Sequence, residues 1–145
     1  MAITDQTPFA IGSDGKIRGV IDGRTYTGPV MTGSAADAAY HQILGAMLEA
    51  DAIGDFYAGG VRSMIARVKL LRAPGMRELV RQTVREFVCG DVYLGKDADF
   101  DAVFAGRGWE PVAVALEAWQ AQDFFLLPGM TPGKVRLQEE KRAAG

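Results

Sequence analysis

Hydrophobic and polar residues follow two different periods along this 145-residue chain, and the period changes near Met31. Before that point, short apolar runs are separated by two Asp-Gly pairs, Asp14-Gly15 and Asp22-Gly23. Asp-Gly between such runs is a strong hairpin signal, because a type I′ turn requires positive φ at both central positions. The pattern therefore predicts a small three-stranded meander over residues 1–31, which should pack against helices because such a sheet is marginal alone.

Beyond Met31 the apolar residues recur at helical spacing. Breaks at Gly54, Pro74-Gly75 and Gly90 separate the helical segments, and Pro111 stands where a first helical turn tolerates proline. The predicted helices cover residues 35–50, 55–72, 76–88, 100–105 and 111–122. The expected fold class is α+β and mostly α, with the N-terminal β-meander followed by a bundle of about four to five helices.

The length fits a single globular domain, which we expect over residues 1–127, with the β segment at 1–31 and the helical body at 32–127. Two Pro-Gly breaks then precede a polar tail, which we expect to be flexible over residues 128–145. The residues expected in the core occupy the apolar positions of the helices. They are Tyr40, Leu44, Met64, Val68, Leu79, Val84, Phe87, Phe104, Leu116 and Trp119.

The composition excludes several classes of protein. No apolar run approaches the roughly 18–20 residues that a membrane span needs, and the N-terminus lacks the basic and apolar regions of a secretory signal. The single cysteine, Cys89, cannot form an internal disulfide, which favours a reducing, cytoplasmic location. With one cysteine and one histidine, the usual zinc ligand sets are excluded, and we expect no metal and no cofactor.

Charge is segregated along the chain although the net charge is only −2. The segment from Arg62 to Arg85 has seven basic residues against one acidic residue, and the segment from Glu86 to Asp123 has two against eight. This pattern indicates intramolecular pairing or contact with a second copy, so we expect a homo-oligomer.

Three arginines, Arg77, Arg81 and Arg85, are spaced four residues apart and would form one basic stripe on a helix. They are candidate partner-binding residues. The alternatives are a solvated helix face, pairing with the acidic segment, or a phosphate-binding stripe of a small nucleic-acid-binding regulator. Because the stripe has no aromatic residue in register and the whole chain is acidic, nucleic acid is the less favoured partner.

An apolar run, Phe124 to Leu127, follows the last long helix and precedes the two Pro-Gly breaks. It has two interpretations, core packing at a helix end or an exposed aromatic anchor for a partner. Phe124 and Phe125 are therefore candidate partner-binding residues.

No motif indicates an enzyme. Asp37 and His41 lie four residues apart and could face each other, but no nucleophile is placed near them, so a surface helix pair is the simpler interpretation. Asp97, Asp99 and Asp101 alternate as the first ligands of a calcium loop do, but the sixth and twelfth positions of that loop carry alanine and glycine. Acidic residues at the start of a helix explain these aspartates, because they favour the helix dipole.

The segment Phe87 to Phe125 resembles the tail assembly chaperones of long-tailed (siphovirus-type) bacteriophages. The resemblance rests on Phe-x-x-x-Phe-Ala-Gly-Arg, here Phe100 to Arg107, followed by a helix rich in Ala, Val and Leu that ends in aromatic residues. The residues that match the motif are Phe100, Phe104, Gly106 and Arg107. This chain has Gln122-Asp123-Phe124 where the family often has Asn-x-Phe, and outside this segment only the order of elements is similar.

This resemblance implies a non-catalytic tail assembly chaperone that binds the tape-measure protein while tail tube protein assembles, in the cytoplasm of the bacterial host. A structural or adaptor protein of a phage head, neck or tail would have the same composition. That alternative remains open at this point, as does the nucleic-acid-binding regulator.

Overall fold

The structure is a computed structural model, and it describes residues 6–50 and 53–127. Its strands are β1 (Thr7–Ile11), β2 (Lys16–Ile21), β3 (Arg24–Pro29), β4 (Val88–Cys89) and β5 (Val92–Tyr93). Its helices are α1 (Gly33–Ala50), α2 (Ile53–Phe56), α3 (Gly60–Leu70), α4 (Met76–Val84), α5 (Asp97–Val103) and α6 (Glu110–Ala121). An N-terminal antiparallel meander followed by several helices confirms the predicted α+β class.

The chain divides into two compact units. The first, which we call the sheet unit, consists of Met1–Thr32 and Glu78–Gln122. The second, which we call the helical unit, consists of Gly33–Arg77 and Asp123–Gly145. The chain passes from the helical unit back to the sheet unit within α4. We describe each unit by itself.

The sheet is antiparallel throughout, in the order β1-β2-β3-β4-β5. Asp22 and Gly23 have φ of 50° and 75°, as the predicted type I′ turn between β2 and β3 requires. The other Asp-Gly pair differs, because only Gly15 has a positive φ. That hairpin closes through a longer loop in which the Gly12 amide donates to the Lys16 carbonyl at 2.8 Å.

The two C-terminal strands replace the end of a predicted helix. We predicted a helix over 76–88, but α4 ends at Val84, and Val88 pairs with Thr27 of β3 and with Tyr93 of β5. The open edge of β3 supplies backbone partners that outweigh the continuing helical pattern. Phe87, just before β4, is buried over Gly28, where an added Cβ would lie 2.6 Å from its ring.

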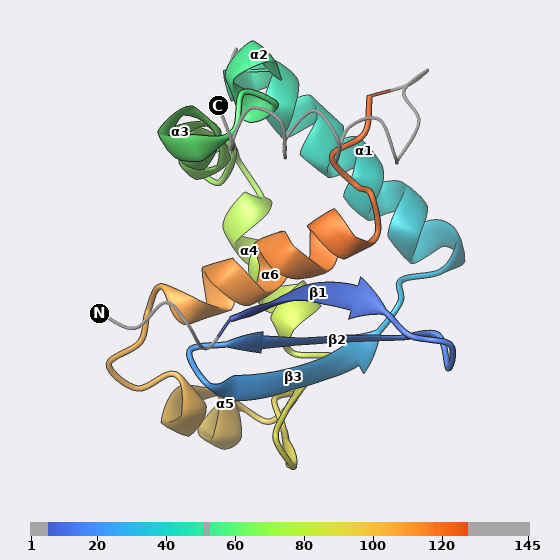
Figure 1. Cartoon of the computed structure of the whole chain (residues 1–145), viewed down its shortest axis with the longest axis vertical. Helices are drawn as coiled ribbons and strands as arrows, with labels where there is room; N and C mark the ends of the chain where they lie inside the picture. The colour runs from blue at the N-terminus through green and yellow to red at the C-terminus, as the bar shows by residue number, and fades with distance from the viewer. Residues whose placement is uncertain (1–5, 51–52, 128–145) are drawn as a thin grey trace. The chain divides into compact units, whose positions relative to one another are not determined.

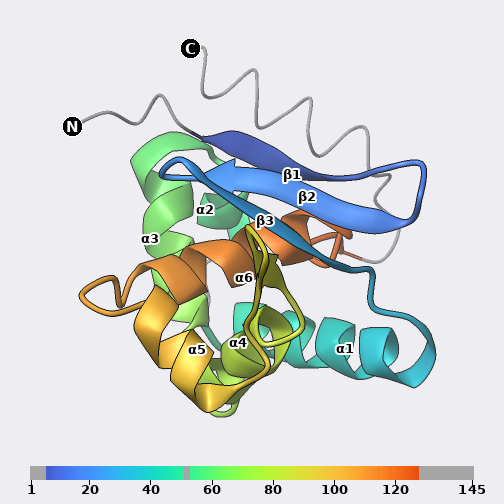
Figure 2. The ribbon, with the colours of Figure 1, turned by 90° about the horizontal axis from the view of Figure 1, so that it is seen from below.

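Helix α6 packs against β1 and β2 and supplies much of the core of the sheet unit (Figure 1; Figure 2). Trp119 is fully buried, and its indole nitrogen donates to the Thr83 hydroxyl of α4 at 3.0 Å. The Thr83 hydroxyl in turn donates to the Leu79 carbonyl at 2.8 Å. The sheet therefore gains an apolar cover from the helix that begins at the predicted Pro111 turn.

In the helical unit, α3 packs against α1 and α2. The helix predicted over 55–72 is interrupted at Gly59 and Gly60, which both have positive φ, so that α2 and α3 are separate. The buried residues of α3 are Ser63, Ala66 and Leu70.

The ten predicted core residues have three different outcomes: five are buried, three are half-buried and two are exposed. Buried as predicted are Leu79, Val84, Phe87, Phe104 and Trp119, while Tyr40, Leu44 and Leu116 are half-buried. The prediction is wrong for Met64 and Val68, which are exposed, because α3 faces its neighbours with its small residues. The predicted tail at 128–145 lies outside the described residues. In the described ranges, no helix combines the length and apolarity needed to cross a bilayer.

Candidate partner-binding surface

The family-like motif Phe100–Arg107 forms the end of α5 and the turn that follows it. The Phe104 ring is buried and stacks on Tyr26 of β3 with 6.4 Å between ring centroids, and Phe100 meets Phe104 edge-on at 4.9 Å. Gly106 has a φ of 69°, a conformation that favours glycine, so the chain can turn towards α6. The motif therefore fixes α5 to the sheet.

Arg107 ends the motif at a buried carboxylate. Glu110, the first residue of α6, has 0% exposure. It accepts hydrogen bonds from Arg107 Nη2 at 2.6 Å, from Arg24 Nη1 at 3.0 Å and from the Tyr26 hydroxyl at 2.5 Å. Arg107 also pairs with Asp22 in the β2–β3 turn. We call this set of five residues the Glu110 cluster.

The pKa values of two members of the Glu110 cluster are shifted by their partners and by burial. Burial, followed by the hydrogen bond to Glu110, raises the pKa of the Tyr26 hydroxyl well above its ordinary range. Hydrogen bonds to Glu110 and to Asp22 raise the pKa of Arg107. Both donors keep their protons at physiological pH, so their hydrogen bonds to Glu110 and Asp22 join strand, turn and helix. Arg107 belongs to the cluster, Phe104 stacks on its Tyr26, and Gly106 provides the turn between them, so these motif residues have an architectural role in this structure.

The three arginines of the predicted stripe have different environments. Arg77 is exposed. Arg81 is also exposed, and its guanidinium lies 5.6 Å from the Phe100 ring centroid. Arg85 follows the end of α4, is half-buried, pairs with Asp97 and donates to the Gly95 carbonyl at 3.1 Å. For Arg85, the structure therefore supports the alternative of pairing with the acidic segment.

The aromatic run is covered. Phe124 is 8% exposed and Phe125 is 3% exposed. The Phe125 ring lies 4.8 Å from the Phe56 ring, and the Tyr57 hydroxyl donates to the Phe125 carbonyl. These contacts support the core-packing interpretation of the run and argue against its use as an exposed anchor.

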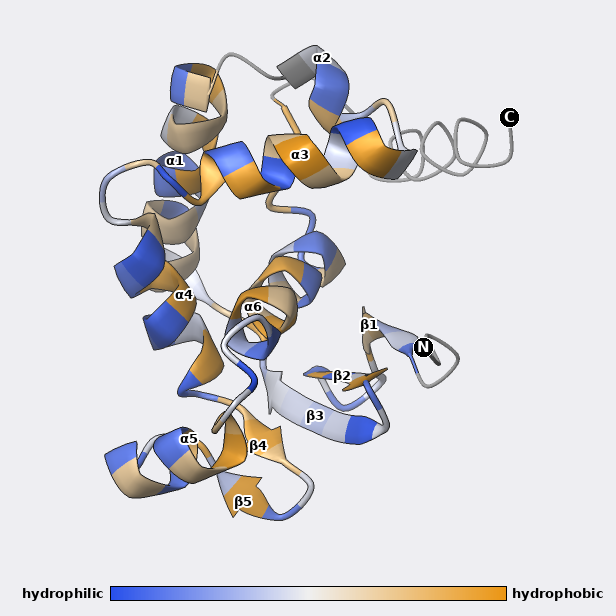
Figure 3. Ribbon diagram, turned by 90° about the vertical axis from the view of Figure 1, so that its left-hand side faces the viewer, coloured by the Kyte–Doolittle hydropathy of each residue, from blue (hydrophilic) through white to orange (hydrophobic). Residues whose placement is uncertain are grey.

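Four exposed apolar side chains lie together on α3, where the sequence predicted core positions. Its members share one side of the helix, opposite the buried Ser63, Ala66 and Leu70. They are Val61 (69% exposed), Met64 (63%), Ile65 (51%) and Val68 (57%). Orange segments recur along α3 in Figure 3. We call these four residues the α3 face.

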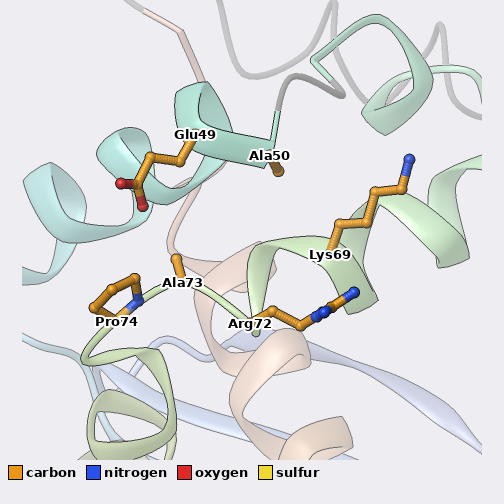
Figure 4. A pocket seen from close by; sticks show the side chains of 6 residues that line it. All are labelled: Glu49, Ala50, Lys69, Arg72, Ala73 and Pro74. Carbon is orange, nitrogen blue, oxygen red and sulfur yellow. The ribbon is translucent and has the colours of Figure 1, made fainter.

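Basic residues accompany the α3 face. Arg62, Lys69 and Arg72 are exposed, and no ion pair joins them to another residue in the part of the chain that the structure describes. Lys69 and Arg72 also line an open surface hollow of about 500 Å³ between the ends of α1 and α3, shared with Glu49, Ala50, Ala73 and Pro74 (Figure 4). The surface thus combines apolar side chains with exposed basic side chains that make no ion pair within the described residues.

The sequence-based prediction placed two residues of the α3 face, Met64 and Val68, in the core. The signal it missed is on the other side of the helix, where Ser63 and Ala66 are small. Small side chains let helices approach closely, so that side can pack while the larger residues face solvent.

Among the described residues, two kinds of group bear on the question of catalysis. No cluster of three metal-binding side chains occurs within residues 6–50 and 53–127. His41 Nδ1 lies 3.5 Å from an Asp37 carboxylate oxygen on the exposed side of α1, which is the predicted surface pair. This pair has no nucleophile beside it among the contacts that the structure records.

Searches against protein-family models, curated proteins and solved structures found no match to this chain.

Proposed function

We propose that this protein is a non-catalytic tail assembly chaperone of a long-tailed bacteriophage, which binds the tape-measure protein and assists assembly of the tail tube. The observation that carries a binding function is the α3 face, where four large apolar side chains on one helix are at least half exposed. Contiguous exposed apolar surface of this kind marks protein-interaction sites in soluble proteins. The resemblance at Phe100–Arg107 supplies the kind of partner.

A tape-measure protein is long and helical, so before tube assembly it would expose apolar stripes. A small domain with an apolar helix face could mask such stripes when many copies bind along the length.

Co-expression with the long protein encoded beside this one, followed by affinity capture, tests the proposal. A chaperone should be captured with that protein in several copies, should keep it soluble and should be absent from purified virions by mass spectrometry. Presence in virions at a fixed stoichiometry would instead support a structural or adaptor protein. Binding to DNA or RNA that weakens steeply with salt would support the nucleic-acid-binding regulator.

A further inference from the structure

The α3 face covers a limited arc of the helix surface, and basic residues lie along one edge of it. At about 100° per residue, Val61, Met64, Ile65 and Val68 span an arc of about 100° on the helix surface. Arg62 and Lys69 are seven residues apart, so they lie within about 20° of each other along one edge of this arc. The opposite edge carries Arg67, whose guanidinium nitrogen donates to the Ser63 hydroxyl at 2.9 Å and lies over the Phe56 ring.

We infer that the α3 face is a docking site for an amphipathic helix of another protein, and that this helix carries acidic residues along one edge of its apolar stripe. The inference rests on the proposed function and specifies the surface and the partner chemistry. The apolar stripe provides the contact area that one helix presents to another. Arg62 and Lys69 select acidic side chains on one edge, and Arg72, with Lys69, extends the positive charge beyond the end of α3.

Charge complementarity argues against two other occupants of the α3 face, a second copy of this chain and the chain's own C-terminal segment. A second copy meeting this one by its own α3 in a two-fold contact would bring the same cations together, which is repulsive. The chain's own C-terminal segment, residues 128–145, contains four basic and two acidic residues, so its net charge has the same sign as the border of the face. An acidic helix from a different protein satisfies both the apolar and the charged parts of the surface.

The test uses the full-length protein and two fluorescently labelled synthetic helices of about 21 residues, which share one apolar stripe. One peptide has glutamates along one edge of that stripe, and the other has lysines at the same positions. We expect the glutamate peptide to bind at least tenfold more tightly than the lysine peptide in low salt, with the difference narrowing as salt rises. Equal binding of both peptides, or no binding of the glutamate peptide, would overturn the inference.

Two pairs of substitutions locate the site. Met64→Ser with Val68→Ser should weaken glutamate-peptide binding at least tenfold, whereas Ile11→Ser, at an exposed apolar residue of β1, should leave it unchanged. Arg62→Glu with Lys69→Glu should reverse the preference in favour of the lysine peptide, whereas Lys16→Glu should not. All four substituted positions of the double variants are exposed, and circular dichroism with thermal unfolding checks that they fold as the parent does. A double variant that folds and binds like the parent would place the site elsewhere.

The same variants separate this inference from the proposed function. If the tape-measure protein is captured equally by the parent and by both double variants, the chaperone function stands and the α3 inference fails. If the glutamate peptide binds through α3 but the tape-measure protein is not captured, the docking surface stands and the function fails. If removal of residues 128–145 raises the affinity for the glutamate peptide tenfold, the face binds the chain's own tail and the inference is overturned. If light scattering shows a parent dimer that Met64→Ser with Val68→Ser dissociates, the face binds a second copy and the inference is likewise overturned.

Discussion

Replacing Glu110 by alanine should destabilise the sheet unit by about 2–4 kcal/mol. Removing one partner of a buried ion pair typically costs about 3–5 kcal/mol, because the remaining charges lose their compensation. The expected value is lower here because the Arg24 and Arg107 side chains are 32% and 25% exposed and can reach water. The Tyr26 hydroxyl has no such route, since its residue is fully buried, and losing its acceptor contributes about 1–3 kcal/mol of the total.

Intrinsic fluorescence measures this effect well, because both tryptophans, Trp109 and Trp119, lie in the sheet unit. Urea unfolding followed at their emission should show the midpoint of Glu110→Ala shifted to lower denaturant, with Glu110→Gln between it and the parent. The matched control is Glu86→Ala, an exposed glutamate of the same unit, which should change stability by less than about 0.5 kcal/mol. A loss below about 1 kcal/mol for Glu110→Ala would mean that the cluster does not hold the unit together.

Three further substitutions test the cores of the two units and the pH response. The raised pKa of Tyr26 means that the folded state holds the phenolic proton more tightly than the unfolded state does. The free energy of unfolding should therefore be constant at neutral pH and fall above the reference pKa of 10.0. Tyr26→Phe should remove that fall, which urea unfolding at a series of alkaline pH values measures. Trp119→Ala should destabilise the sheet unit by about 3–5 kcal/mol in thermal unfolding, because it empties a fully buried site, and a loss under about 1 kcal/mol would contradict that burial. Phe125→Ser should lower the stability of the helical unit by about 3–5 kcal/mol in circular dichroism melts, whereas a stable variant that had lost only partner binding would restore the exposed-anchor interpretation.

The sequence predicted correctly those features that depend on neighbouring residues alone, such as a tight turn and the start of a helix. Asp22-Gly23 forms the expected type I′ turn because both residues tolerate positive φ, and Pro111 lies in the first turn of α6 because its missing amide hydrogen is not needed there. Asp14-Gly15 is the same pair of residues but forms a different turn. There the Asp14 carboxylate accepts hydrogen bonds from the Arg18 guanidinium and from the Lys16 amide, which lower the pKa of Asp14 to about 2 and stabilise a longer loop.

The Glu110 cluster could not be predicted from sequence, because its members come together only in the tertiary fold. Arg24 and Tyr26 are more than eighty residues before Glu110 in the chain. By spacing alone, Glu110 was an acidic residue in the first turn of a helix, a position usually found in solvent. The strands β4 and β5 were missed for a similar reason, since only the free edge of β3 makes pairing there favourable.

The prediction of burial failed for Met64 and Val68 for a physical reason. Periodicity shows which side of a helix is apolar, but burial depends on which side its neighbours can approach. On α3 the side with the small residues Ser63 and Ala66 packs against the neighbouring helices, and the side with the large apolar residues faces solvent.

The positions of the motif and of the α3 face bear on the proposed function. The motif that suggests the family, Phe100–Arg107, is occupied with holding the sheet unit together through Tyr26 and Glu110. Residues that hold the sheet unit together in this way do not locate the binding surface. The partner must therefore be sought on a surface that the framework leaves free, and within the described residues the α3 face is where large apolar side chains and unpaired cations occur together. It follows that substitutions in the motif should reduce partner binding only in proportion to lost stability, whereas substitutions on the α3 face should reduce binding in a protein that remains folded.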